Sequence, residues 1–259
     1  MASFVRFNSA RGPAWGVIAS DGVTVRAVEG SVFDNWKIGS AVGAVCDLDL
    51  IPPCKPQTVA ALAYNFKDLV GPRETYEEPL VFLKSPAAVI GSRENIRRPQ
   101  WIDKMWVEVE IGVVVRTPIF EATRSEAAAA ILGLVITNDV TATNIGGRDH
   151  HLARSKSLAT FCPVGDVLHT DINANNLILS TSINGKMTQY GNTNNRICDE
   201  VDAVMLVSRM MPLVPGDLIL TGTPAGAMDS IVEPGDDVEL IVESLGRLNN
   251  QITQGEKEF

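Results

Sequence analysis

The chain has 259 residues, with 22 Lys and Arg against 31 Asp and Glu, and a formal net charge of −9. Hydrophobic residues make up 45% and charged residues 20%, a globular composition that excludes general disorder. The acidic balance argues against a nucleic-acid or anionic-membrane partner, since either favours a basic face. No segment approaches the roughly 18 apolar residues of a membrane span, and the N-terminus does not resemble a secretion signal. We therefore expect a cytoplasmic protein.

The first part of the chain is predicted to be a small β-rich domain. Phe4–Phe7, Trp15–Ala19 and Val23–Val28 are short apolar runs separated by turn residues. The stretch from Ile51 to Pro56 contains three prolines, which remove backbone donors and favour a connector. We predict two domains, residues 1–55 and residues 56–259.

The second domain is also expected to be rich in strands, with few helices. Thr58–Asn65, Trp106–Val115 and Leu134–Asn138 are predicted strands. Thr123-Arg124-Ser125-Glu126 has the form of a capping box and predicts a helix that Gly133 ends. These patterns favour an α+β fold that is mostly β.

The C-terminal half continues this pattern. Asn184-Gly185 predicts a hairpin, and Asp199–Met211 predicts a helix. Two similar turns, Val214-Pro215-Gly216-Asp217 and Glu233-Pro234-Gly235-Asp236, each precede an apolar strand. Gly246 is expected to begin a final turn, and the last six residues are expected to fray.

Glu108 and Glu110 are the first candidates for chemistry. Two residues apart in a strand, they project to the same face, while Val107 and Val109 project to the other. The strand continues as an apolar run, so the pair either lies near the interior, where a divalent cation would offset its repulsion, or forms a wet acidic edge. Asp139, at the end of the next apolar strand, is a candidate third ligand or simply a turn residue.

Several separated motifs resemble the fumarylacetoacetate hydrolase superfamily. The resemblance runs from about Pro56 to Ile252 and is strongest to the branch with the isomerase/decarboxylase of homoprotocatechuate degradation and the acylpyruvase and oxaloacetate-acting proteins. The motifs are Ala63-Tyr64-Asn65-Phe66-Lys67-Asp68, Glu78 to Lys84, Glu108-Val109-Glu110, Asn138-Asp139-Val140, Ser155-Lys156-Ser157, Asn184-Gly185 with Gln189, Pro215 to Gly226, and Gly246-Arg247-Leu248-Asn249.

The resemblance implies a mixed β-sheet fold, usually a homodimer, that acts on acidic 2-oxo compounds. It implies Glu108, Glu110 and Asp139 as ligands of Mg²⁺ or Mn²⁺, which would stabilise an enolate as a Lewis acid. Lys156 matches the catalytic lysine, which can donate to the substrate or move protons if the metal lowers its pKa. The implied substrate contacts are Thr223 and Gly222 in a glycine-rich turn, and Gln189; Lys84 is either near the pocket or in a structural ion pair.

The sequence departs from the family pattern in the lid. Leu69 and Pro72 stand where a His–Glu pair commonly activates water, and leucine cannot carry a proton. His150 or His151 could supply a base from another loop, and Arg148 could bind a distal carboxylate of the substrate; a solvated loop is the alternative for all three.

These departures weaken hydrolysis most, because hydrolysis needs an activated water. We therefore predict a metal-dependent decarboxylase or isomerase (tautomerase) of an unsaturated 2-oxo acid. Three alternatives remain: a C–C hydrolase of acylpyruvate type, a protein that keeps the fold without the chemistry, and a specialised enzyme whose apolar substrate packs against Leu69 and Phe66.

Overall fold

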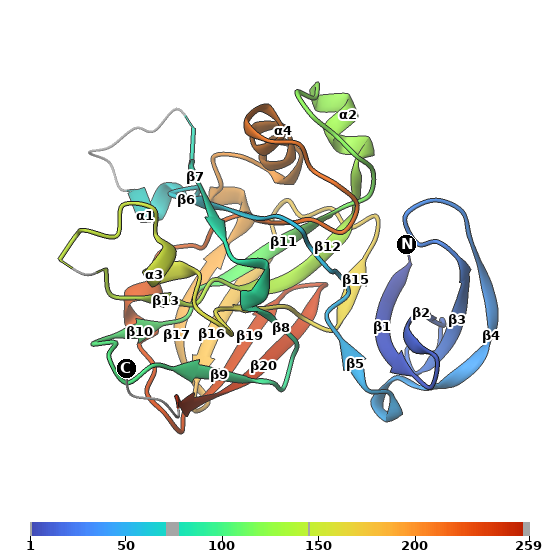
Figure 1. Ribbon diagram of the computed structural model, residues 1–259, viewed down its shortest axis with the longest axis horizontal. Coiled ribbons are helices and arrows are strands. Elements are labelled where there is room, and N and C mark those ends of the chain that lie inside the picture. The colour runs from blue at the N-terminus through green and yellow to red at the C-terminus, as the bar shows by residue number, and fades with distance from the viewer. Residues whose placement is uncertain (1, 71–77, 145, 256–259) are drawn as a thin grey trace.

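Strands make up most of the regular structure and gather into one large and one smaller sheet (Figure 1). The computed structural model describes residues 2–70, 78–144 and 146–255. Within these residues the large sheet has the order β4-β3-β2-β1-β15-β12-β11-β18-β6-β7, with β5 paired to β1. Its strands are β1 (Ser3–Ser9), β2 (Gly12–Ile18), β3 (Thr24–Gly30), β4 (Trp36–Ala44), β5 (Leu50–Ile51), β6 (Val59–Ala63), β7 (Leu80–Lys84), β11 (Val109–Val115), β12 (Ile131–Asn138), β15 (Val167–His169) and β18 (Leu218–Leu220).

The smaller sheet has the order β17-β16-β19-β20-β9. Its strands are β9 (Asn95–Arg98), β16 (Ile178–Ile183), β17 (Lys186–Asn192), β19 (Asp237–Val242) and β20 (Gly246–Gln254). Two short pairs complete the strands: β10 (Met105–Trp106) with β13 (Thr141–Ala142), and β8 (Val89–Ile90) with β14 (Cys162–Pro163).

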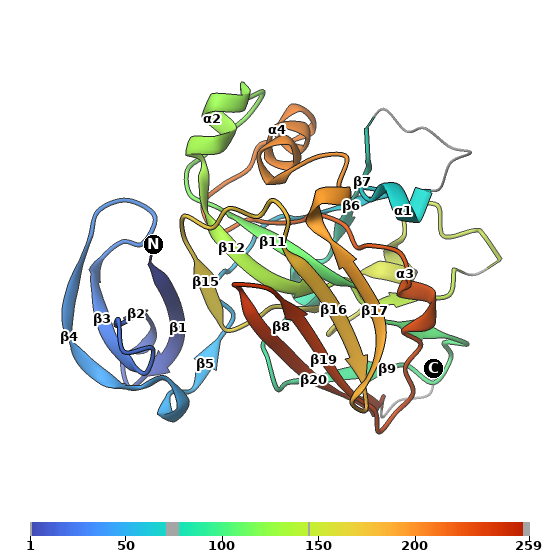
Figure 2. The same cartoon turned by 180° about the vertical axis from the view of Figure 1, so that it is seen from behind.

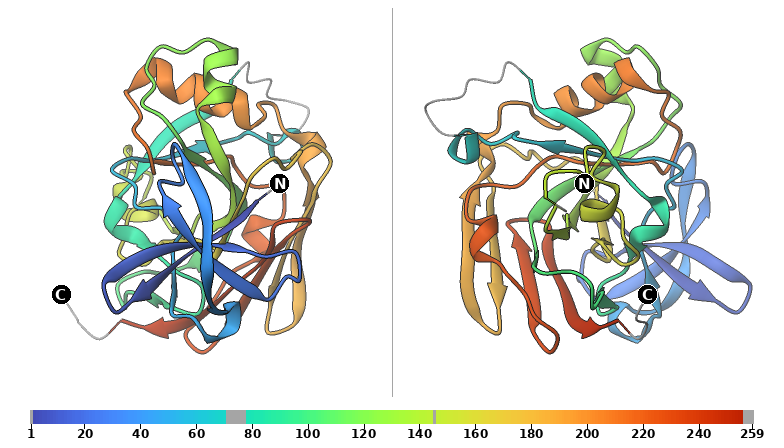
Figure 3. Two further views of the ribbon diagram at one scale, coloured as in Figure 1. Left: turned by 90° about the vertical axis from the view of Figure 1, so that its right-hand side faces the viewer. Right: turned by 60° about the vertical axis from the view of Figure 1, so that its left-hand side comes forward.

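Helices are short and lie outside the sheets. The α-helices are α1 (Lys67–Val70), α2 (Arg124–Ala129), α3 (Ala153–Lys156) and α4 (Glu200–Met210), and the 3-10 helices are η1 (Val45–Asp47), η2 (Pro86–Ala88), η3 (Thr193–Asn195) and η4 (Ala227–Asp229). Figure 3 shows α2 and α4 side by side at one end of the molecule, where Arg124 binds Asp199 and Asp202. No helix in the described part of the chain is long and apolar enough to cross a membrane. The α+β, mostly β class is confirmed.

The main core lies where the two sheets face each other. β11 and β12 of the large sheet pack against β16, β19 and β20 of the smaller one (Figure 2). All seven residues of β11 are buried, which explains why its sequence after Glu110 is apolar on both faces. This packing gives the strand that carries Glu110 a rigid position.

The N-terminal strands β1 to β4 form an antiparallel meander at one side of the molecule (Figure 1). They have a small core cluster of their own around Val5, Phe7 and Val25. Their sheet nevertheless continues into the large one, because β1 pairs with β15 through Phe4 and Leu168. The boundary after residue 55 stays a prediction.

Several local predictions are confirmed. Thr123 and Glu126 form a complete capping box at the start of α2, and Asp199 caps α4 in the same way. The β16–β17 hairpin turns at Asn184 and Gly185, which have φ angles of 51° and 78°. Both angles lie in the left-handed region that a type I′ turn requires.

Three local predictions were wrong in detail. The run Trp106–Val115 is two strands, β10 and β11, because the backbone N–H groups of Val107 and Glu108 donate to Ser230 and Asn138 instead of a continuous ladder. Gly133 lies inside β12 rather than ending a helix; a Cβ there would come within 2.5 Å of the His169 carbonyl oxygen. Gly246 opens β20, and of the tail expected to fray, residues 256–259 lie outside the described residues.

Candidate functional site

A cavity of about 570 Å³ contains the predicted metal ligands and Lys156. Its lining comes from the ends of β6, β7, β11 and β12, from the loop and helix around α3, and from η4. Tyr64 borders it with a φ of 62°, so the chain turns away from β6 at this point and the predicted strand Thr58–Asn65 stops at Ala63.

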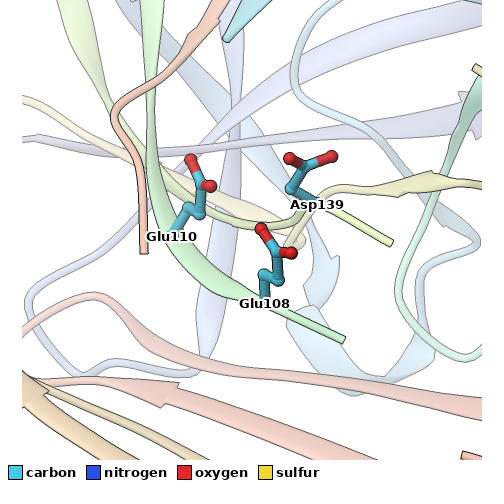
Figure 4. A group of neighbouring side chains, drawn as sticks. All are labelled: Glu108, Glu110 and Asp139. Carbon is cyan, nitrogen blue, oxygen red and sulfur yellow. The ribbon is translucent and has the colours of Figure 1, made fainter. Parts of the chain in front are cut away.

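Three carboxylates converge in this cavity, turned toward a common space (Figure 4). Glu110 lies on β11, Glu108 lies between β10 and β11, and Asp139 follows β12. The antiparallel register pairs Val109 with Asn138, which places the two glutamates beside the aspartate. One oxygen from each residue lies within 4.8 Å of the others. The two glutamates therefore share a face, as their spacing predicted, and Asp139 joins them.

Hydrogen bonds fix the orientation of both glutamates. Glu108 Oε1 accepts from Trp106 Nε1 at 2.7 Å and from Thr141 Oγ1 at 2.9 Å. Glu110 Oε2 accepts from the backbone N–H of Gly222 at 2.6 Å. Both side chains are nearly inaccessible to solvent, so these bonds exchange little with water.

Two lysines neutralise part of the acidic charge. Lys84 Nζ binds Asp139 Oδ1 and the carbonyl oxygen of Lys156, and it is 2% exposed. Lys156 Nζ donates to Asp139 Oδ2 at 2.6 Å and to Glu108 Oε2 at 3.1 Å. Lys84 is thus in a buried ion pair that holds both Asp139 and the Lys156 backbone, which resolves the choice that the sequence left open.

Burial and neighbouring charges act differently on the three groups. Burial, reinforced by Asp139 and Glu108, raises the pKa of Glu110 well above its ordinary value. Burial alone would raise the pKa of Asp139, but Lys156 and Lys84 outweigh it and hold that pKa below its usual range. Burial alone would lower the pKa of Lys156, yet Asp139 and Glu108 raise it. Lys156 is therefore a cation here, and the prediction of a lowered pKa depends on a bound metal.

The donor set fits a divalent cation. Fully ionised, the three carboxylates would exceed the two ammonium groups in a buried space, and the raised pKa of Glu110 reflects this cost; a divalent cation would allow all three to stay ionised. Carboxylate oxygens are the ligands that Mg²⁺ and Mn²⁺ prefer. The triad of Glu108, Glu110 and Asp139 could hold such an ion.

The predicted substrate contacts are close to the triad but differ in their access to the cavity. Thr223 lines it; its hydroxyl donates to the Val109 carbonyl oxygen and accepts from Gln189 Nε2. Gln189 is 2% exposed, and both its amide groups bond within the protein. Gly222 uses its N–H on Glu110. This geometry fits Gln189 and Gly222 as positioning groups and leaves Thr223 as the member that can touch a ligand.

The candidate residues of the two loops also differ in whether they line the cavity. His150 and Leu69 line the cavity, whereas Arg148 is exposed and is not part of the lining, and His151 borders a neighbouring depression. Phe66 is fully buried in the core, so the predicted packing of a substrate against it is wrong. Pro72 lies outside the described residues.

Sequence reasoning missed two residues that shape the site. Trp106 and Thr141 both line the cavity and both donate to Glu108. Their spacing gave a usable signal, since each lies two residues from a predicted ligand on an extended chain.

Comparison with known proteins identifies the family. The sequence model of the fumarylacetoacetate (FAA) hydrolase C-terminal domain matches residues 58–253. The chain belongs to the fumarylacetoacetate hydrolase family, whose members are enzymes, and it is similar to the family's isomerase branch.

Two solved structures and one curated protein show which reactions similar proteins are named for. The structure is similar to that of 2-hydroxyhepta-2,4-diene-1,7-dioate isomerase from Mycobacterium marinum, with a TM-score of 0.88, 31% identity, and 99% and 100% of the two chains covered. It is equally similar to 5-carboxymethyl-2-hydroxymuconate delta-isomerase from Mycobacterium smegmatis, with a TM-score of 0.88, 32% identity, and 98% and 100% covered. The mitochondrial oxaloacetate tautomerase FAHD2B of Bos taurus is 30% identical over 217 residues, 78% of this chain and 68% of that protein.

Proposed function

We propose that this protein is a divalent-metal-dependent isomerase that interconverts the enol and keto forms of a 2-oxo acid. The observation that carries the proposal is the convergence of Glu108, Glu110 and Asp139 beside Lys156 in one cavity. The similarity to two isomerases and an oxaloacetate tautomerase supports the same reaction class.

Each residue has a definite task in this proposal. Glu108, Glu110 and Asp139 would hold Mg²⁺ or Mn²⁺, and the ion would supply Lewis acidity that stabilises negative charge on the substrate. Lys156 Nζ gives a proton to, or takes it from, the carbon next to the 2-oxo group. Thr223 lines the cavity, and its hydroxyl accepts from Gln189 Nε2 at 2.8 Å. To donate to the substrate carboxylate, this hydroxyl would turn away from the Val109 carbonyl oxygen that now accepts its proton.

Isomerisation requires fewer catalytic groups than hydrolysis. Moving a proton between oxygen and carbon needs an electron sink and a proton carrier, and no activated water. Leu69 borders the cavity where a histidine would be required for the family's water activation, and a leucine cannot replace it. Decarboxylation uses the same electron sink, so it belongs to the same proposal as a second outcome for a suitable substrate.

The test follows the enol of 2-oxobutanedioate in the ultraviolet with Mg²⁺, with Mn²⁺ and with EDTA. We expect metal-dependent loss of the enol, and at least a 100-fold lower kcat/KM for Glu110→Gln, consistent with losing an essential electrostatic group. Glu239→Gln is the matched control, because Glu239 pairs with Arg247 and borders a different depression, not the cavity of the triad. Turnover that survives EDTA and Glu110→Gln would contradict the proposal.

Hydrolysis of an acylpyruvate is the second candidate, and the position of His150 favours it over any other alternative. His150 lines the cavity and is the only histidine of the described residues to do so. Release of two acids from an acylpyruvate, abolished by His150→Ala and retained in His151→Ala, would identify this reaction. The homodimer and the cytoplasmic location stay predictions.

A further inference from the structure

The cavity changes character from its floor to its opening. Its floor consists of the buried triad and Lys156. Its opening is bordered by four large apolar side chains that remain 38–59% exposed: Tyr64, Leu69, Leu80 and Met228. An entering ligand would therefore contact apolar side chains first and the charged groups of the floor last.

The apolar border is assembled from separate parts of the chain. Tyr64 follows β6, Leu69 lies in α1, Leu80 begins β7 and Met228 lies in η4. Single exposed apolar residues are common on protein surfaces, but a group around one opening indicates a binding surface. Leu62, Ala63 and Phe82 continue this apolar wall inward to the triad.

The polar part of the lining does not favour a second acidic group on the ligand. It includes Asn144, Asp149 and His150, and Asp149 is held there by the N–H and hydroxyl of Ser155, both at 2.8 Å. Among the described lining residues the carboxylates outnumber the ammonium groups. A distal carboxylate on the ligand would meet the apolar wall or the carboxylate of Asp149, and both are unfavourable for it. Asn144 and His150 could donate hydrogen bonds to it, but the described lining has no arginine, and its lysine, Lys156, is bound to the triad.

We infer that the substrate is a 2-oxo acid with an uncharged alkyl or aryl tail, which packs on the apolar wall formed by Tyr64, Leu69, Leu80 and Met228. This inference rests on the proposed function, since that function assigns the acidic floor to the oxo-acid head. The cavity volume of about 570 Å³ supports it, because pockets of about 300–1,000 Å³ hold ligands of many more atoms than a four-carbon acid. The reaction at the head is unchanged: the enol O–H bond breaks, a C–H bond forms at C3, and no atom is gained or lost.

The experiment compares two enols with the same head. One is 2-oxo-3-phenylpropanoate, with an aryl tail, and the other is 2-oxobutanedioate, with a carboxylate. With Mg²⁺-loaded wild type we expect kcat/KM to be at least about tenfold higher for the phenyl compound, the discrimination typical of filling an apolar subsite. Leu69→Ser and Met228→Ser should each lower the ratio of the two kcat/KM values about three- to tenfold. Met210→Ser is the matched control, because Met210 is 52% exposed on α4 away from the cavity, and it should leave the ratio unchanged.

Each outcome separates this inference from the proposed function. Preference for 2-oxobutanedioate, or a ratio that the wall variants do not move, overturns the apolar subsite and leaves the isomerase intact. Turnover of neither enol refutes the isomerase, and the subsite is then decided by binding, measured as quenching of tryptophan fluorescence, since Trp106 lines the cavity. Tighter binding of the phenyl compound, weakened by Leu69→Ser, supports the subsite; equal binding of the two acids overturns it.

Discussion

Replacing Asp217 by alanine should destabilise the protein strongly, although Asp217 is not part of the cavity. Its side chain is fully buried and accepts three backbone N–H groups: Gln57 at 2.9 Å, Thr58 at 2.8 Å and Val214 at 2.8 Å. Gln57 and Thr58 precede β6, and Val214 opens the turn before β18, so this one carboxylate joins two parallel strands at their start. Both strands lead to residues of the site.

The magnitude follows from the three donors that would be left without a partner. A buried donor without a partner costs about 1–3 kcal/mol, so Asp217→Ala should lower the free energy of unfolding by about 3–5 kcal/mol, allowing for partial access of water. For a domain of this size that corresponds to a fall in Tm of about 6–20 °C. Asp217→Asn retains one acceptor oxygen and should lower the free energy of unfolding by less than Asp217→Ala does.

The assay is thermal and urea unfolding of both variants beside Asp236→Ala. Asp236 occupies the same position in the second Pro-Gly-Asp turn, but near solvent; it accepts from Asn184 Nδ2 at 2.7 Å and makes its one backbone bond to the Glu233 N–H at 2.8 Å. Water can replace that bond, so we expect a loss of no more than about 1 kcal/mol. Equal losses for Asp217→Ala and Asp236→Ala would refute the reasoning, because it rests on the burial of Asp217 and on its three backbone donors.

The remaining predictions concern metal, backbone and pH. Mg²⁺ at about 100 times its Kd should stabilise the wild type by about 2.7 kcal/mol in thermal unfolding, and Glu110→Gln should lose this gain. Gly222→Ala should lower the free energy of unfolding by at least about 2 kcal/mol, since its Cβ would lie 2.9 Å from Asn65 Cβ at a φ of 88°. Gly235→Ala has open space around its Cβ at a φ of 101° and should lower it by only about 1 kcal/mol. Burial lowers the pKa of His169 below 6.5, so between its folded and unfolded pKa values the unfolded state binds more protons than the folded state. The free energy of unfolding should therefore fall as pH drops from neutral through 6.5. His169→Gln should reduce this fall, measured by urea unfolding.

Three results would count against these expectations. A Mg²⁺-dependent rise in Tm that persists in Glu110→Gln would place the ion elsewhere. Equal costs for the two glycine variants would show that the left-handed backbone, and not the contact with Asn65, decides the loss. A pH dependence identical in wild type and His169→Gln would mean that burial does not hold this imidazole neutral.

Much of the candidate site could be predicted because it depends on spacing along one strand. Glu108 and Glu110 share a face by strand geometry alone, and the hydrogen-bonded register then places Asp139 beside them. The surroundings of these residues could not be predicted in the same way. Lys84 is 55 residues from Asp139 in sequence, and its choice between a pocket and an ion pair depended on which strand lay next to which. Gln189 likewise was expected to touch substrate, and only packing shows that its amide is fully used within the protein.

The two Pro-Gly-Asp turns separate what the sequence determined from what the tertiary structure decided. Their local conformation was predictable from the sequence, because proline followed by a glycine with positive φ determines the turn whatever lies around it. So was the capping box at Thr123, which bonds only to near neighbours in the chain. The hairpin turn at Asn184 was also predictable from its Asn-Gly pair, although Asn184 bonds in addition to the distant Asp236 and Asp237. The different roles of Asp217 and Asp236 were not, since burial and long-range partners depend on strands that meet only after folding. Local hydrogen bonds need only adjacent residues, whereas the environment of a charge is set by every element that packs around it.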